Sequence, residues 1–137
     1  MKLTEHFTLE ELTRSATARR LGIDNTPTPE VKANLKALCV NVLEPLRQAW
    51  GAPIVVTSGY RSIKLNRAVG SKDTSQHVHG EAADIHTVSD TPTDNRKLIR
   101  VMKRLALPID QCIDEYNGDW LHVSYSRRHR RRYFSLP

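Results

Sequence analysis

Several features that mark whole protein classes are scarce or absent in this sequence. It has only two cysteines, Cys39 and Cys112, and aromatic residues make up 6% of its 137 positions. No apolar run approaches the roughly eighteen residues that a membrane-spanning helix needs. The first residues, Met1–His6, lack the apolar core of a signal peptide. We therefore expect no transmembrane segment, a chain that is cytoplasmic as synthesised, and two buried, reduced thiols.

The length and composition are those of one globular domain. A chain of 137 residues is long enough for one core and too short for two. Hydrophobic residues make up 39% and charged residues 26% of the chain, and neither an internal repeat nor a low-complexity linker interrupts it. We predict a single domain over residues 1–137.

Positive charge is concentrated at the C-terminus. Five arginines fall within the six positions 127–132, and removing them from the formal net charge of +6 leaves +1. We expect residues 127–137 to form a basic tail beyond the folded strands, suited to an anionic polymer. Nucleic acid is not the expected partner, because one arginine cluster without interleaved aromatics or a recognition motif indicates only general phosphate attraction.

Capping and periodicity signals predict an α+β protein. Thr8 and Glu11 form a capping-box pattern, and Thr28 with Pro29 begins the longest helix, which Pro45 should kink near Asn41. Asn117-Gly118 between two apolar runs favours a two-residue hairpin turn. The order of elements predicts a small, mostly antiparallel sheet with flanking helices. Expected helices lie near residues 8–15, 17–21, 29–50, 63–68 and 92–105, and expected strands near 53–57, 82–86, 109–116 and 119–125.

Two histidines and one aspartate stand out as metal ligands. His77 and Asp84 lie seven residues apart with Gly80 between them, and His122 follows in a later strand. Two imidazoles and one carboxylate without a fourth protein ligand suit one catalytic Zn²⁺ that keeps a position open for water. His79 and His86 lie close to these residues, but we do not assign them as ligands.

Three segments in this order resemble a known family. Ser75–Asp84 reads S-x-H-x-x-G-x-A-x-D, Trp120–Val123 reads W-L-H-V, and Ser58–Ser62 reads S-G-Y-R-S. Together they are similar to the zinc D-Ala-D-Ala carboxypeptidases that act on peptidoglycan. Related groups are the vancomycin-resistance D-Ala-D-Ala dipeptidases and the phage L-alanyl-D-glutamate endolysins.

The resemblance implies a hedgehog/DD-peptidase-like fold with a zinc cleft on one face of the sheet. It implies hydrolysis of an amide bond in peptidoglycan stem peptides, with Arg61 reaching the cleft to steady the developing oxyanion or a substrate carboxylate. The Ser75 hydroxyl is a candidate to bond the substrate backbone, or else it stabilises its own loop. The missing signal peptide is consistent with a phage- or prophage-encoded lysin that is released to the cell wall. The alternative is a non-catalytic zinc-containing module that binds peptidoglycan or a protein partner.

Two residues compete for the role of general base. The resemblance points to an acidic residue three positions before the last zinc histidine, which is Asp119. Strand alternation points elsewhere, because a two-residue turn pairs Glu115 with Trp120 and places both on the face of His122. Asp119 would then point away from that face. The sequence keeps both Glu115 and Asp119 as candidates.

Overall fold

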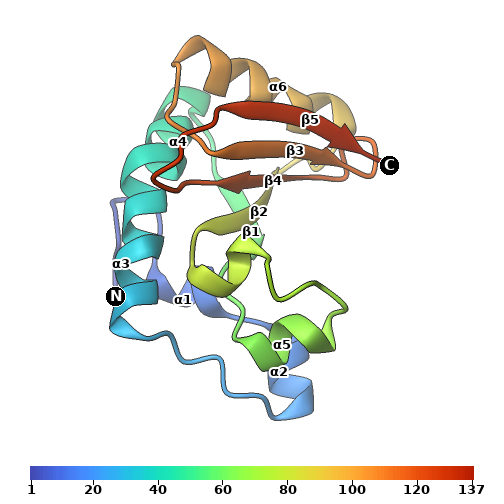
Figure 1. Cartoon of the computed structure of the whole chain (residues 1–137). Helices are drawn as coiled ribbons and strands as arrows, with labels where there is room; N and C mark the ends of the chain where they lie inside the picture. The colour runs from blue at the N-terminus through green and yellow to red at the C-terminus, as the bar shows by residue number, and fades with distance from the viewer.

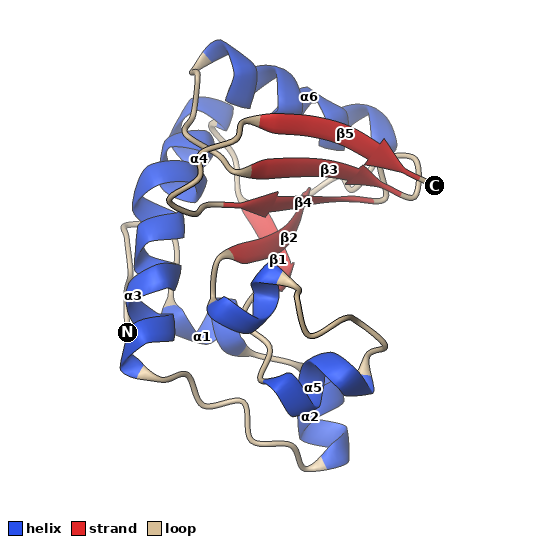
Figure 2. Ribbon diagram, viewed as in Figure 1, coloured by secondary structure: helices blue, strands red, loops and turns tan.

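One five-stranded sheet organises the computed structural model, which describes residues 1–137 (Figures 1 and 2). The strands lie in the order β1-β2-β4-β3-β5, and every neighbouring pair is antiparallel except β3 and β5, which are parallel. Their bounds are β1 (Ile54–Ser58), β2 (Ala82–Thr87), β3 (Gln111–Glu115), β4 (Trp120–Ser124) and β5 (Arg132–Leu136).

The predicted α+β class agrees with this architecture, but the sheet is mixed rather than the mostly antiparallel sheet that the sequence predicts. The physical reason lies in the neighbours of β4, whose two edges are already occupied by β2 and β3. When the chain reverses after β4, its next strand pairs at the free edge of β3, the neighbour of β4 that has no second partner. Because β4 runs antiparallel to β3, the returning β5 runs parallel to β3. Figure 1 shows β5 beside β3 at the edge of the sheet.

The C-terminal segment is part of the fold, which corrects the prediction of a basic tail at 127–137. Arg132–Leu136 forms β5, and Tyr133 pairs in register with Cys112 of β3. Tyr133 packs against the hydrophobic core, and the Lys103 ammonium lies 4.8 Å from the centre of its ring. The arginine run obscured this strand in the sequence, since charge dominates the composition there.

Local capping signals placed most helices correctly. The Thr8 hydroxyl accepts from the backbone of Glu11, which completes the predicted capping box, and Thr28 caps the helix that begins at Pro29, as expected. The helices are α1 (Leu9–Thr13), α2 (Ala16–Leu21), α3 (Pro29–Leu38), α4 (Glu44–Trp50), α5 (Ile63–Ala68) and α6 (Pro92–Arg104).

The interruption predicted near Asn41 takes the form of a π-helical segment, η1 (Cys39–Leu43), between α3 and α4. Pro45 has no backbone N–H to donate to Asn41, and its ring would clash with that carbonyl in a regular helix. The wider turn relieves the clash, and the Glu44 N–H bonds to the Cys39 carbonyl instead. The chain therefore continues in one direction through α4 without a break.

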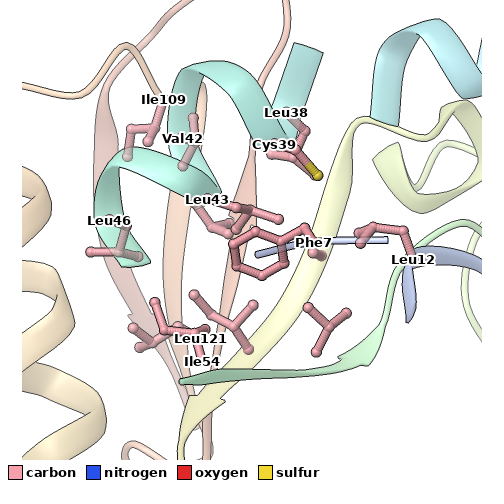
Figure 3. Packing of buried hydrophobic residues seen from close by; sticks show 14 of the residues in the cluster. Phe7, Leu12, Leu38, Cys39, Val42, Leu43, Leu46, Ile54, Ile109 and Leu121 are labelled. Carbon is pink, nitrogen blue, oxygen red and sulfur yellow. The ribbon is translucent and has the colours of Figure 1, made fainter. Parts of the chain in front are cut away.

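The core lies between these helices and one face of the sheet. Phe7 is 1% exposed and sits among α3, η1, α4 and the strands, as Figure 3 shows. Cys39 and Cys112 are both buried and free, as predicted, and burial raises the pKa of each thiol to about 12. No helix has the length and apolar character needed to cross a membrane. The opposite face of the sheet is left open for polar side chains.

Candidate metal centre

Three predicted ligand residues converge on the open face of the sheet from three different elements. Asp84 in β2 pairs directly with His122 in β4, and His77 comes from a short 3₁₀ helix, η2 (Gln76–His79). Asp84 Oδ1 lies 3.2 Å from His77 Nε2 and 3.1 Å from His122 Nδ1. The two imidazole rings face edge to plane with centroids 4.9 Å apart. One small cation can therefore contact all three side chains.

His77 is held from behind by the backbone. Its Nδ1 lies 2.6 Å from the Gly59 carbonyl oxygen, which fixes the ring and directs Nε2 toward Asp84. Gly59 is required because a Cβ there would lie 2.2 Å from the Leu12 carbonyl oxygen at the end of α1. The S-G-Y-R segment thus supplies a carbonyl that orients a ligand, a role that the sequence did not reveal.

Gly80 shapes the turn between the two ligands His77 and Asp84. Its φ is 72°, a left-handed conformation that L side chains rarely adopt, and it ends η2. A Cβ at this position would lie 2.9 Å from both Cγ1 and the carbonyl oxygen of Val31 in α3. The glycine therefore lets the chain turn tightly against α3 and enter β2 in the register that presents Asp84.

The donor set fits a zinc ion. Burial alone would raise the pKa of Asp84, but hydrogen bonds from His122 and His77 outweigh it and hold that pKa well below its usual range. The carboxylate is thus ionised at neutral pH, as a metal ligand must be. Two imidazole nitrogens and one carboxylate oxygen, with His77 oriented by a backbone carbonyl, match the requirements of a catalytic zinc site.

These ligands line an open cleft of about 440 Å³. Arg61, Ser75 and Glu115 line the same cleft, as the sequence predicted for Arg61 and Ser75. A larger hollow of about 610 Å³ lies between α3 and residues 125–128 and contains none of the ligand residues. The candidate metal site therefore does not lie in this larger pocket.

Arg61 lines the cleft and has one buried, unpaired donor. Its Nε has no hydrogen-bond partner in the protein. Burial lowers the pKa of the guanidinium, whereas the charges of Asp84 and Glu115 act in the opposite direction. Guanidinium remains protonated in proteins, so Arg61 is a positive charge with spare hydrogen-bonding capacity beside the metal ligands.

Ser75 has a local structural contact in addition to its place in the cleft. Its Oγ accepts a hydrogen bond from the backbone N–H of His77 at 3.3 Å and caps η2. The hydroxyl proton remains available for a substrate oxygen.

The structure places Glu115 at the cleft and Asp119 outside it. Glu115 pairs with Trp120, and Ile113 with His122, in the register that alternation predicted. The connection is longer than predicted, however, because residues 116–119 all lie in the turn. Glu115 lines the cleft and accepts a hydrogen bond from the Trp120 indole nitrogen at 2.9 Å. Asp119 is exposed in the turn and is not among the lining residues.

His79 and His86 lie outside the ligand group. His79 is exposed. The His86 ring bonds the Thr87 carbonyl at 2.6 Å.

A second group of ligand-type residues, Glu5, His6 and Glu44, was not visible in the sequence. There the His6 ring and backbone bond the Glu44 carboxylate at 2.6 and 2.8 Å, which fastens the N-terminal segment to α4.

An α+β fold in which two histidines and one aspartate line an open cleft is typical of zinc hydrolases. Comparison with protein families identifies the family. Residues 5–124 match Peptidase M15, and the chain belongs to this family of metallopeptidases. The resemblance drawn from the three motifs is thereby confirmed. M15 peptidases are zinc-dependent, in agreement with the donor set. No curated protein matches the chain.

Proposed function

We propose that this protein hydrolyses an amide bond in peptidoglycan stem peptides, using one Zn²⁺ held by His77, Asp84 and His122. The observation that carries the proposal is the convergence of these three ligands with Arg61 and Glu115 in a single open cleft. A zinc ion at this place polarises a carbonyl and lowers the pKa of water toward about 7. The remaining chemistry belongs to side chains of the chain itself.

Glu115 is our choice for the general base. Its carboxylate takes a proton from the attacking water and passes it to the nitrogen of the leaving amine. The Trp120 indole N–H holds one carboxylate oxygen at 2.9 Å and leaves the other for the proton. Asp119 would need a rearranged turn to reach the same position, since its side chain lies outside the cleft.

Arg61 and Ser75 orient the substrate in this proposal. The positive charge of Arg61 at the lining of the cleft suits a substrate carboxylate or the oxyanion that develops during hydrolysis. Among the candidate substrates, a stem peptide that ends in D-Ala-D-Ala has a free C-terminal carboxylate next to the scissile bond, where Arg61 can bind it. D-Ala-D-Ala is therefore our first choice of bond. The L-Ala-D-Glu bond and cross-bridge bonds are the next candidates. The Ser75 hydroxyl donates a hydrogen bond to a carbonyl oxygen of the substrate backbone.

The metal site can be tested by elemental analysis. His77→Ala and His122→Ala each remove one of only three protein ligands, so stoichiometric zinc should be lost from both variants. His79→Ala is the matched control, because His79 is exposed and lies outside the ligand group; it should retain one zinc per chain. Full zinc occupancy in both ligand variants would contradict the assignment.

The bond that is cleaved can be identified by mass spectrometry of purified muropeptides. We expect the loss of terminal D-alanine from pentapeptide stems, and we expect a chelator or His122→Ala to abolish it. Separation between L-Ala and D-Glu would make the protein an endopeptidase instead. An unchanged muropeptide profile with a zinc-loaded protein would favour the non-catalytic binding module.

A further inference from the structure

The arginines near the C-terminus are not all available to an external polyanion. Asp110 is fully buried, and Arg130 donates to it through Nε at 2.8 Å and Nη2 at 3.0 Å. Arg128 adds a longer contact of 3.4 Å to the same carboxylate. Two of the clustered arginines, Arg128 and Arg130, are therefore paired with one buried aspartate.

The backbone of this arginine turn, residues 126–131, is fixed by the same aspartate. The Arg130 N–H donates to Asp110 Oδ1 at 3.2 Å, and the Arg132 N–H donates to the Asp110 carbonyl at 3.1 Å. His129 and Arg131 have φ values of 39° and 53°, which non-glycine residues adopt only when neighbouring contacts enforce them. The Asp110 contacts supply that enforcement.

Asp110 also bonds the short helix η2, which carries the ligand His77. Gln76 donates its side-chain Nε2 to Asp110 Oδ2 at 2.8 Å. Gln76 is the first residue of η2 and directly precedes His77, and its carbonyl accepts from the Glu81 N–H at 3.1 Å. One buried carboxylate thus joins the arginine turn to the short helix that carries a metal ligand.

We infer that Gln76 is a positioning residue for the metal ligand His77 and that it acts through Asp110 and Arg130. The inference rests on the proposed function in that it takes His77 as a zinc ligand. The helix η2 has only four residues, so it cannot fix its own position by internal hydrogen bonds. Loss of the Gln76 contact removes the side-chain bond that links the start of η2 to Asp110. The Ser75 cap, the Arg61 N–H bond to the His77 carbonyl at 3.1 Å and the Gly59 contact with the His77 ring remain.

Substitutions at Gln76 can distinguish a positioning role from a purely structural one. Gln76→Ala removes the link to η2 but leaves Asp110 with its arginine partners, so the fold keeps its buried ion pair. Gln76→Lys restores a donor toward Asp110. Arg127→Ala is the matched control, since Arg127 is exposed and makes no ion pair with the protein.

The experiment measures the zinc dissociation constant by competition with a chromophoric chelator, the absorption spectrum of the cobalt-substituted protein, and the melting temperature of the metal-free protein. For Gln76→Ala we expect zinc binding weakened about tenfold and a shifted cobalt spectrum, with an unchanged melting temperature. Gln76→Lys should recover most of the affinity, and Arg127→Ala should match the unaltered protein.

Wild-type zinc affinity and cobalt spectrum in Gln76→Ala would overturn the positioning role while leaving the metal site intact. A fall in melting temperature without any change in zinc affinity would also overturn it. Failure of the unaltered chain to bind zinc would instead contradict the proposed function, together with the inference that rests on it.

Discussion

Glu115→Gln is expected to lower the turnover of a stem peptide by roughly 10²–10⁴-fold while zinc occupancy stays near one per chain. The glutamine amide oxygen can still accept the hydrogen bond from Trp120, so the shape of the cleft is retained. What is lost is the proton acceptor. Steady-state kinetics on a purified muropeptide, with zinc measured on the same sample, separates this loss from a loss of metal.

Asp119→Asn is the matched control for Glu115→Gln. Asp119 lies in the exposed turn, and only its backbone is engaged: its N–H donates to the Glu115 carbonyl at 3.1 Å and its carbonyl accepts from Asn95 at 3.3 Å. Its amide variant should therefore keep near wild-type turnover. Loss of activity in Asp119→Asn alone would contradict the role of Glu115 and would require the turn to rearrange when substrate binds. Unchanged turnover in both variants would remove both residues from the mechanism.

The sequence predicted the correct face for Glu115 even though its turn was wrong. A two-residue and a four-residue connection both leave Glu115 opposite Trp120, and alternation then fixes the side of the sheet. Asp119 depends on the turn itself, and there the positive φ of Tyr116 could not be anticipated, because the hairpin signal calls for positive φ only at Asn117 and Gly118. Residues inside strands were therefore more predictable than residues in the loop between them.

Long-range polar contacts were beyond the reach of the sequence. The caps at Thr8 and Thr28 involve residues three positions apart, so they can be read locally. The contact between Gln76 and Asp110 spans 34 positions, and the contact between Asp110 and Arg130 spans 20. A run of arginines looks like a solvated surface until the fold places a buried carboxylate among them. β5 was missed for the same reason, because its parallel pairing with β3 depends on contacts between distant parts of the chain.

A chain that ends at Ser126 is expected to be much less stable than the full-length protein. Truncation removes β5 and leaves the fully buried Asp110 without Arg130 or Arg128. Leaving one member of a buried ion pair unpaired costs about 3 kcal/mol, to which the loss of the Tyr133 packing adds. The free energy of unfolding in urea, measured on both metal-free proteins at neutral pH, should fall by at least this amount.

The pH dependence gives this truncation experiment a second, independent readout. In the full-length chain, hydrogen bonds from Arg130 hold the pKa of Asp110 well below its usual range, against the effect of burial. That stabilisation is present above the ordinary pKa of an aspartate and is lost as the pH falls. The truncated chain lacks Arg130 and Arg128, so the pKa of Asp110 loses its largest lowering cause and this pH-dependent stabilisation is absent. The difference in stability between the two chains should therefore narrow as the pH is lowered.

The control variant carries Arg127→Ala together with Arg131→Ala in the full-length chain. It removes two of the five clustered charges but keeps β5 and the side chains that bond Asp110, so its unfolding free energy should stay near that of the unaltered protein. Equal stability of the truncated and full-length chains would contradict the structural role of the segment. β5 is the strand that pairs with the outer edge of β3. Equal stability would therefore mean that the pairing of β5 with β3 contributes nothing to the stability of the full-length protein.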